Sequence, residues 1–339
     1  MKIVPLGTSS GQPTLERNVS GLAAYVGSDS SWVMVDCGEG TQQRMMRAKP
    51  ALSWFDLDAI LITHTHGDHC FGIFGVLAAL SMSGRTRPLK LVAPHEVKTM
   101  AETVLKASHT HLSYALDWTE PVDTLVISLS ERLEATCIKM SHRAPSHGYL
   151  LSSSKVVLNV DGEAFAHAGY KEDPERGRAV ACAKLGEPSV APGGQGSVDM
   201  THAVSFKRHV ESLFVGGDNL EPLRVAQAAA GACVWVHEAT YVHEDWEREG
   251  MGVKWGHSSA RMVGEAAAIG KPGALVLTHF SPRYGAGVLG VERLRSEAQE
   301  AFGGRVEIAH DLEVLEFKPR IESCARPKSA RQSARRQQR

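Results

Sequence analysis

The stretch AILITHTHGDHCFGI, residues 59–73, joins a short apolar run to a cluster of polar side chains. Residues 59–63 predict a buried strand, and the pattern from residue 70 onward predicts a helix. Between them stand His64, His66, Asp68 and His69. Side chains two positions apart beyond a strand end can converge on one point, and the following Asp-His pair can face a second point nearby. Imidazole and carboxylate without a thiolate are typical of catalytic zinc or manganese sites.

Unrelated surface histidines are the alternative to a metal site, but the strand–turn–helix context favours the site. Four residues hold at most one metal ion and part of a second, so further ligands are needed. His142, Asp218 and His279 each follow an apolar run, at 135–140, 213–217 and 274–278. Folds of the α/β class assemble their sites from loops at the carboxyl ends of strands. Each residue alone would be an ordinary polar residue at a strand end, whereas together the seven complete a site for two metal ions.

The rest of the chain mixes strand and helix patterns along its length, which predicts an α/β layered domain. Further strands are expected at 2–6, 22–26, 32–36, 125–129, 156–160, 233–237 and 306–310, and helices at 41–48, 70–82, 95–107, 219–230, 257–268 and 291–301. No apolar run reaches the roughly 18–20 residues needed to cross a bilayer, and the N-terminus has no secretion signal. We therefore expect a soluble, cytoplasmic protein that does not contact a membrane.

Composition and charge exclude several classes of protein. The 339 residues are 43% hydrophobic and 22% charged, which excludes a disordered or fibrous chain. The six cysteines form no CxxC pair, so a disulfide scaffold or thiolate zinc site is not expected. Net charge is −1, yet the segment after Lys318 holds seven basic residues against Glu322. The body is therefore acidic, and a basic domain of the usual nucleic-acid-binding type is excluded.

Two segments do not fit the layered domain. Residues 168–200 are polar and rich in glycine and proline, and we expect an inserted arm or mobile loop there, with a plain surface connector as the alternative. The basic residues 319–339 are expected to form a disordered tail, because almost nothing there can be buried. The predicted organisation is thus one domain over residues 1–318, with an inserted arm at about 168–200, and a tail.

Several motifs together resemble ribonuclease Z, the tRNA 3′-processing endonuclease of the metallo-β-lactamase superfamily. HxHxDH alone identifies only the superfamily. More particular to the family are Asp36-Cys37-Gly38-Glu39-Gly40-Thr41-Gln42, the Gly-His-Ser element around His257, and LTHFSPRY, residues 277–284. LGTSSGQPTLERNVS, SHRAPSHGY and HEATY add to the match, which runs from about residue 3 to 317. The resemblance implies a four-layered αββα metallo-β-lactamase fold and a metal-dependent endoribonuclease.

The resemblance also implies roles for individual residues. Two Zn²⁺ ions per subunit are expected, with Mn²⁺ as an alternative. His64, His66 and His142 would hold one ion, Asp68, His69 and His279 the other, and Asp218 would bridge them. Asp68 would orient the attacking water or take its proton, and His257 would stabilise the scissile phosphate or protonate the departing 3′ oxygen, with Glu238 fixing its ring. Without the resemblance, His257 could simply be a neighbour of a helix-capping serine.

Substrate contacts are expected from two loops. Ser9, Arg17 and Asn18 would line the substrate mouth, and Arg283 and Tyr284 would contact phosphate and a base; an ordinary turn and a closed loop are the alternatives. The implied substrate is precursor tRNA, cut to leave a 3′-hydroxyl, and the implied assembly is a homodimer.

The arm departs from the family pattern. The family carries a basic arm that grips tRNA, whereas the charges within 170–197 cancel here, so little counterion release is expected from it. Two other functions therefore remain open. One is a hydrolase of a small phosphodiester or other ester without tRNA specificity. The other is an RNA-binding or scaffold protein with a decayed centre.

Overall fold

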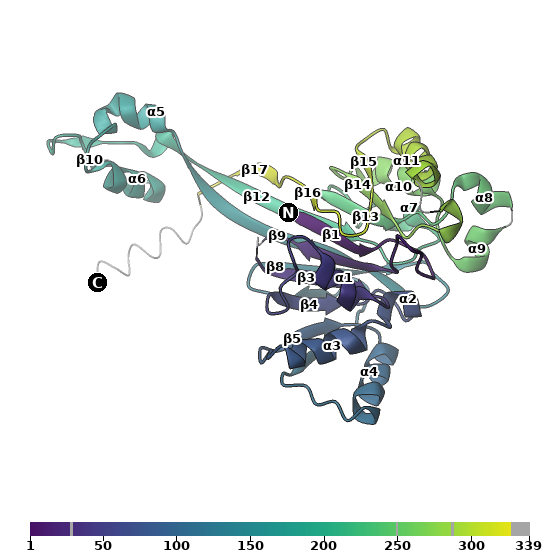
Figure 1. Cartoon of the computed structure of the whole chain (residues 1–339). Helices are drawn as coiled ribbons and strands as arrows, with labels where there is room; N and C mark the ends of the chain where they lie inside the picture. Colours follow the sequence, from purple (N-terminus) through teal and green to yellow (C-terminus); the bar gives the residue numbers. More distant parts are fainter. Residues whose placement is uncertain (28–29, 249, 286–287, 327–339) are drawn as a thin grey trace. The chain divides into compact units, whose positions relative to one another are not determined.

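The computed structural model describes residues 1–27, 30–248, 250–285 and 288–326 (Figure 1). The chain divides into two compact units. Unit 1 comprises residues 1–153 and 211–319, and unit 2 comprises residues 154–210 and the segment from Arg320 onward. Among the described residues, no helix is both long and apolar enough to span a membrane.

The first sheet of unit 1 has seven strands in the order β16-β1-β2-β3-β4-β5-β6. Their bounds are β1 Lys2–Gly7, β2 Gly21–Tyr25, β3 Trp32–Cys37, β4 Leu57–Leu61, β5 Leu89–Val92, β6 Leu116–Thr119 and β16 Leu315–Glu316. Strands β3 to β6 run parallel. Every residue of β3 is buried, as expected for a parallel strand covered on both faces. Strands β5 and β6 were missed by the sequence patterns, because they are short and carry charged residues.

The second sheet follows the order β15-β14-β13-β12-β9-β8-β7, with β17 paired to β12. The bounds are β7 Val126–Ser128, β8 Leu133–Met140, β9 Ser146–Val160, β12 Val204–Val215, β13 Val234–Glu238, β14 Leu275–Thr278, β15 Val306–Ile308 and β17 Arg320–Cys324. Strands β12 to β15 run parallel, so their carboxyl ends meet at one edge. Strands β9 and β12 both continue into unit 2.

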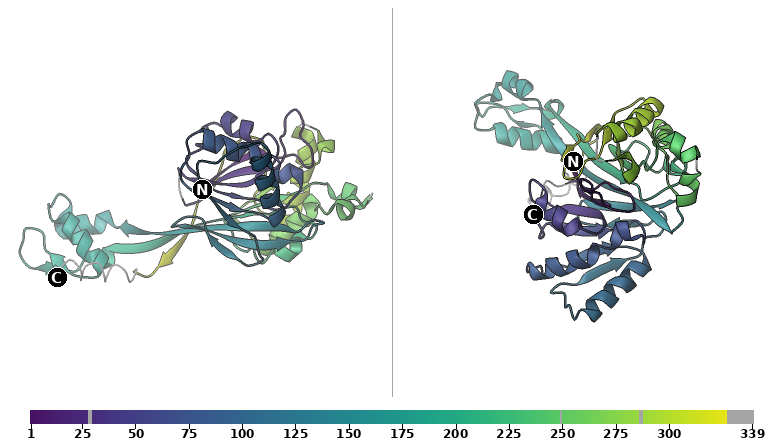
Figure 2. Two further views of the ribbon diagram at one scale, coloured as in Figure 1. Left: turned by 90° about the horizontal axis from the view of Figure 1, so that it is seen from below. Right: turned by 45° about the vertical axis from the view of Figure 1, so that its right-hand side comes forward.

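Apolar side chains from the two sheets form one core between them, including Val35 and Leu61 from the first and Tyr149, Val215 and Val276 from the second. A second cluster joins the outer face of the first sheet to α1 Thr41–Arg47, α3 Ile73–Met82 and α4 His95–Ala107. A third joins the second sheet to α7 Pro222–Val225, α10 Ala260–Gly270 and α11 Val288–Phe302. The four layers, helix–sheet–sheet–helix, confirm the predicted αββα fold (Figures 1 and 2).

Unit 2 has a small core of its own, formed by Phe165, Tyr170, Ala179, Ala183 and Met200 among others. Its elements are α5 Gly162–Phe165, a π-helical turn Ala166–Tyr170, α6 Arg176–Leu185, the hairpin β10 Ser189–Val190 and β11 Ser197–Val198, and a 3₁₀ turn Thr201–Ala203. Residues 168–200 therefore hold a helix and a hairpin, not only irregular loop. The helix packs through the small side chains Ala179 and Ala183, which give a weak apolar signal in the sequence.

The tail also differs from expectation. Strand β17, Arg320–Cys324, pairs antiparallel with β12 from Phe206 to Val210. The expectation of disorder for residues 319–339 is therefore wrong for these five residues, whose backbone hydrogen bonds offset the lack of apolar burial. Residues 327–339 lie outside the described part of the chain.

Candidate metal centre

The structure brings all seven predicted ligands together at one edge of the two sheets. His64, His66, Asp68 and His69 follow β4, and the last two lie in the short helix α2, Gly67–Cys70. His142 follows β8, Asp218 follows β12 and His279 follows β14. Each position is the carboxyl end of a strand, which explains how residues more than 200 positions apart meet.

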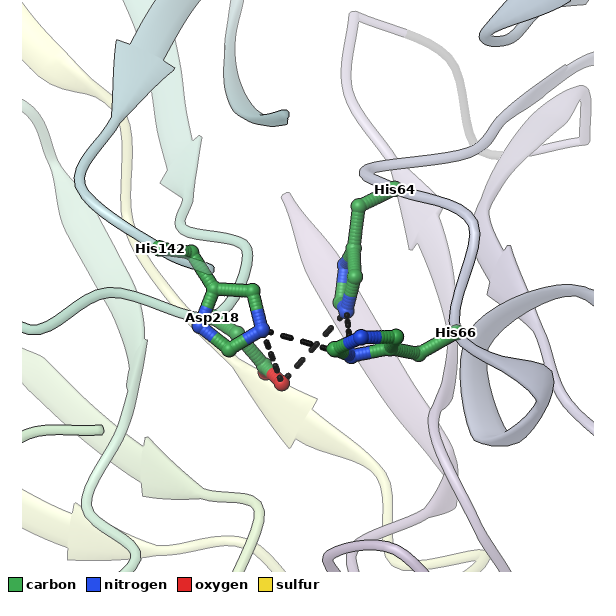
Figure 3. Close-up of side chains that lie close together, drawn as sticks. All are labelled: His64, His66, His142 and Asp218. Carbon is green, nitrogen blue, oxygen red and sulfur yellow. Dashed lines mark hydrogen bonds and ion pairs between the residues drawn. The ribbon is translucent and has the colours of Figure 1, made fainter. Parts of the chain in front are cut away.

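The first group contains His64, His66, His142 and Asp218 (Figure 3). His66 Nδ1 lies 3.1 Å from His64 Nε2 and 3.3 Å from His142 Nε2. The Oδ2 atom of Asp218 lies 3.5 Å from His64 Nε2 and 3.9 Å from His142 Nε2. Burial lowers the pKa of His64 and of His66, which keeps these imidazoles neutral with a nitrogen lone pair available to a cation.

The second group contains Asp68, His69 and His279. The Nε2 atoms of the two histidines lie 3.2 Å apart. Oδ2 of Asp68 lies 3.5 Å from Nε2 of His69 and 3.4 Å from Nε2 of His279. Asp218 also reaches this group, because its Oδ1 lies 3.4 Å from each of the two histidine nitrogens. One carboxylate therefore faces both groups, with a different oxygen toward each.

Both carboxyl groups are held ionised. Burial alone would raise the pKa of Asp218, but His279, His69 and other imidazoles outweigh it and hold the pKa well below its usual range. Burial likewise would raise the pKa of Asp68, and His69 and His279 reverse the effect. Ionised carboxylates and imidazole nitrogens converging on two points form a donor set suited to divalent cations.

Four supporting contacts orient the ligand rings, and none was predicted. His69 Nδ1 lies 2.7 Å from Oδ2 of Asp36, and His142 Nδ1 donates to the Gly256 carbonyl at 2.8 Å. The hydroxyl of Thr63 lies 2.9 Å from His64 Nδ1, and that of Thr240 lies 3.1 Å from His279 Nδ1. Second contacts of this kind fix the tautomer and direction of metal-binding imidazoles. For Asp36 the signal was the DCGEG motif, to which no role was attached.

His257 lies at the edge of this cluster. Its Nδ1 is 3.4 Å from Glu238 Oε1 and 3.8 Å from Asp218 Oδ2, yet makes no hydrogen bond among the described residues. Burial would lower its pKa, but the Asp218 and Glu238 carboxylates outweigh this and raise it to about 9. The Trp246 indole donates to the His257 carbonyl at 2.8 Å, which fixes the backbone of His257. His257 therefore faces the carboxylates of Asp218 and Glu238 at the edge of the predicted metal centre.

Glu238 is fully enclosed and supports its neighbours through several hydrogen bonds. Its Oε1 accepts from the Ser258 N–H at 2.7 Å, and its Oε2 accepts from the hydroxyl and N–H of Thr240 at 2.7 and 3.0 Å. The residue therefore links the His257 segment to the Thr240–His279 contact.

The three residues expected in the substrate mouth have partners inside the protein. Ser9 is fully buried and donates to the Gln12 carbonyl at 2.7 Å. Arg17 donates to Thr8 Oγ1 at 2.9 Å, and Asn18 to the Glu39 carbonyl at 2.9 Å. Their polar atoms therefore shape the loop itself, and contact of these three side chains with substrate stays a prediction.

The two residues expected on the other side of the mouth differ from each other. The Tyr284 hydroxyl accepts from the Val242 N–H at 2.8 Å and donates to Asp245 at 2.9 Å, so it closes a loop. Arg283 is exposed, and its guanidinium lies 5.4 Å from the Tyr241 ring centroid. Arg283 also lies 3.8 Å from Oδ2 of Asp245, and its contact with a substrate stays a prediction.

Comparison with known proteins decides the family. Residues 17–169 match the model of the metallo-beta-lactamase superfamily. Ribonuclease Z of Pseudomonas putida is 38% identical over 92% of this chain and 96% of its own, and that of Marinobacter nauticus is 35% identical over 92% and 95%. The chain belongs to the ribonuclease Z family.

The structure of human tRNase Z, short form, gives a TM-score of 0.64 at 21% identity, covering 94% of this chain and 99% of that one. The similarity to this solved structure shows that the fold is shared as well as the sequence. Membership of this superfamily, together with the His/Asp cluster, implies that this ribonuclease Z-family chain binds a divalent metal.

Proposed function

We propose that this chain is an endoribonuclease that removes the 3′ trailer of precursor tRNA and leaves a 3′-hydroxyl. The observation that carries the proposal is the position of Asp218, whose two oxygens face two separate groups of ligands. The relatives named ribonuclease Z match this chain over nearly their whole length. A two-ion centre suits in-line displacement at a phosphodiester, where charge grows on both the attacking and the leaving oxygen.

We assign two Zn²⁺ ions to the site, with Mn²⁺ as the alternative. His64, His66 and His142 would hold one, Asp68, His69 and His279 the other, and Asp218 both. The fit rests on the donor chemistry and on the ligand atoms of each group lying within 4.8 Å of one another. Bound ions of this kind act as Lewis acids toward the phosphate and lower the pKa of water toward about 7.

The side chains of the protein position the water and supply a proton. Asp68 is held by the Gly11 N–H, which donates to its Oδ2 at 2.8 Å, and it orients the attacking water. His257, cationic and adjacent to Asp218, donates a proton to the departing 3′ oxygen. Glu238 holds the His257 segment in position.

The assembly and location are further parts of the proposal. By resemblance to the family we expect a homodimer, acting on precursor tRNA in the cytoplasm. The net-neutral charge of residues 170–197 leaves other RNA substrates open.

The test incubates the zinc-loaded protein with a trailer-bearing precursor tRNA, a single-stranded RNA and bis(p-nitrophenyl) phosphate, and maps each cut at nucleotide resolution. One cut just past the acceptor stem, leaving a 3′-hydroxyl, supports the proposal. Hydrolysis of the small diester without that cut would show correct metal chemistry and a different substrate.

A further inference from the structure

A cavity of about 450 Å³ opens beside His257. It is lined by Ser10, Gly11, Gln12, Tyr241, Trp255, His257, Ser281 and Pro282. Apart from His257, and Gly11 whose N–H donates to Asp68, these residues have no role in the ligand groups or in the proposed mechanism. The volume is within the range of small-ligand pockets, roughly 300–1,000 Å³. The cavity is therefore a binding space adjoining the proposed general acid, and its occupant is unassigned.

Trp255 is the most exposed aromatic side chain in this wall. It ends helix α9, Met251–Trp255, and is 43% exposed. Arg143 and Lys254 lie over its ring, 5.5 Å and 5.2 Å from the centroid, so two cations contact a partly exposed aromatic side chain. An exposed tryptophan loses apolar hydration when covered, and positive charge beside it attracts an anionic ligand that carries a flat ring.

The backbone fixes Trp255 relative to the metal centre. The next residue, Gly256, has a left-handed φ of 80° and presents its carbonyl to His142 Nδ1 at 2.8 Å. A β-carbon at Gly256 would lie 2.8 Å from that same nitrogen, so the close approach requires glycine. The backbone that carries the indole is therefore tied to a predicted metal ligand, as suits a base-binding surface next to a scissile phosphate.

The lining beyond Trp255 adds recognition elements of the same kind. Tyr241 is buried, with its ring 6.2 Å from that of His257, and Arg283 lies over it at 5.4 Å. Gln12 is exposed and offers an amide donor and acceptor. Aromatic surfaces interleaved with arginine and lysine are the means by which proteins bind unpaired nucleotides, stacking the base and attracting the phosphates.

We propose that this cavity binds the base of the unpaired nucleotide next to the scissile phosphate, with the base stacked on Trp255. The inference rests on the proposed function and specifies the substrate, because a small phosphodiester without a base gains nothing from the platform. Arg143 and Lys254 hold the flanking phosphates, and Gln12 contacts the edge of the base. Recognition through a π-face tolerates all four bases, which suits trailers of varied sequence.

The experiment measures kcat/KM for precursor tRNA with the zinc-loaded full-length protein and its Trp255→Ala, Trp255→Phe and Val253→Ala variants. Each is tested on intact precursor and on precursors carrying one abasic nucleotide at a position flanking the cut. We expect Trp255→Ala to lose roughly ten- to one-hundredfold on intact precursor, and Trp255→Phe to keep most of the activity. Val253, 61% exposed on the same helix, provides the control, and its variant should match the unaltered protein.

The coupling between variant and substrate decides the inference. For one abasic position, kcat/KM of the unaltered protein should fall by a similar factor. On that substrate, Trp255→Ala should have nearly the same kcat/KM as the unaltered protein, because the variant and the abasic site remove the same contact. Undiminished activity of Trp255→Ala on intact precursor overturns the inference. So does a loss that is the same on every abasic precursor as on the intact one.

Failure of the proposed function gives a different result. The unaltered protein would then hydrolyse bis(p-nitrophenyl) phosphate without cutting the precursor. Fluorescence anisotropy with a labelled single-stranded RNA would still test the platform, with roughly tenfold weaker binding expected for Trp255→Ala and near-normal binding for Trp255→Phe. Equal binding by all variants would overturn the platform.

Discussion

The Oδ2 atom of Asp36 lies 2.7 Å from Nδ1 of His69, so the residue near the end of β3 orients a ring that follows β4. Asp36 has a left-handed φ of 60°, a conformation that aspartate and asparagine tolerate better than most residues. Its Oδ1 accepts from the Thr63 N–H at 2.8 Å. One buried carboxylate thus holds the backbone just before the HxHxDH segment and orients one of the imidazoles of that segment.

Asp36→Asn tests this relationship without altering shape or backbone preference. The amide cannot accept from both Thr63 and His69 as the carboxylate does, so one orienting contact is lost. We expect metal affinity to fall about 10–100-fold, with a smaller change in thermal stability. Competition with a zinc chelator provides the affinity; unchanged affinity would mean that the rest of the cluster holds His69 unaided.

Asp68→Ala removes both a proposed ligand and the partner of the attacking water. Hydrolysis of precursor tRNA and of bis(p-nitrophenyl) phosphate should both be abolished, whatever the substrate specificity. Turnover is measured together with bound metal per chain, so that loss of an ion can be told from loss of the residue that orients the water. Substantial residual turnover would refute the assigned centre.

Glu238→Gln separates positioning from binding. The carboxylate accepts from Ser258 N–H and from Thr240, and the amide would turn one acceptor into a donor. Because His257 and the Thr240–His279 contact then lose their fixed geometry, we expect kcat to fall about 10–100-fold with little change in KM. A rise in KM at constant kcat would instead place Glu238 in ground-state substrate binding.

The clustering of the seven proposed ligands could be predicted because its signals are local. HxHxDH directly follows an apolar strand, and His142, Asp218 and His279 each follow another, so the α/β architecture alone brings them together. Asp36 and Thr240 could not be assigned in this way, because their roles depend on side-chain direction between different strands.

The polarity of a residue was also a poor guide to the exposure of its side chain. Arg17 looked like a substrate contact, yet it is buried, and burial lowers its pKa despite the opposing charge of Asp311. Helix α6 was missed for the opposite reason, since its buried side is made of alanines that barely mark an apolar face. Where a contact joins distant segments or a core uses small residues, the pattern carries little information.

Asp311 stabilises the Thr8–Asn18 loop. This loop contains Gly11, whose N–H donates to Asp68. It accepts from the Asn18 N–H and the Thr8 hydroxyl, each at 2.7 Å, and pairs with Arg44 at 3.2 Å. Asp311→Ala leaves these groups without their partner in a largely buried place. We expect about 3 kcal/mol lower free energy of unfolding, measured by urea denaturation.

The matched control is Asp117→Ala, which removes a 57% exposed carboxylate paired with Lys90. Its cost should be within about 0.5 kcal/mol. Equal costs for the two variants would mean that Asp311 does not fasten the loop.

The positions of the basic residues predict which of them contribute to the salt dependence of RNA binding. Lys184 is exposed on α6, in a segment whose charges cancel, whereas Arg143 is exposed next to His142 and Trp255. If phosphates are held mainly at the metal centre, Arg143→Gln should reduce the slope of log(kcat/KM) against log salt by about 1, because one fewer counterion is released. Lys184→Gln should leave the slope unchanged. The reverse order would place the main phosphate contacts on α6 and its neighbours, despite the balanced charge of residues 170–197.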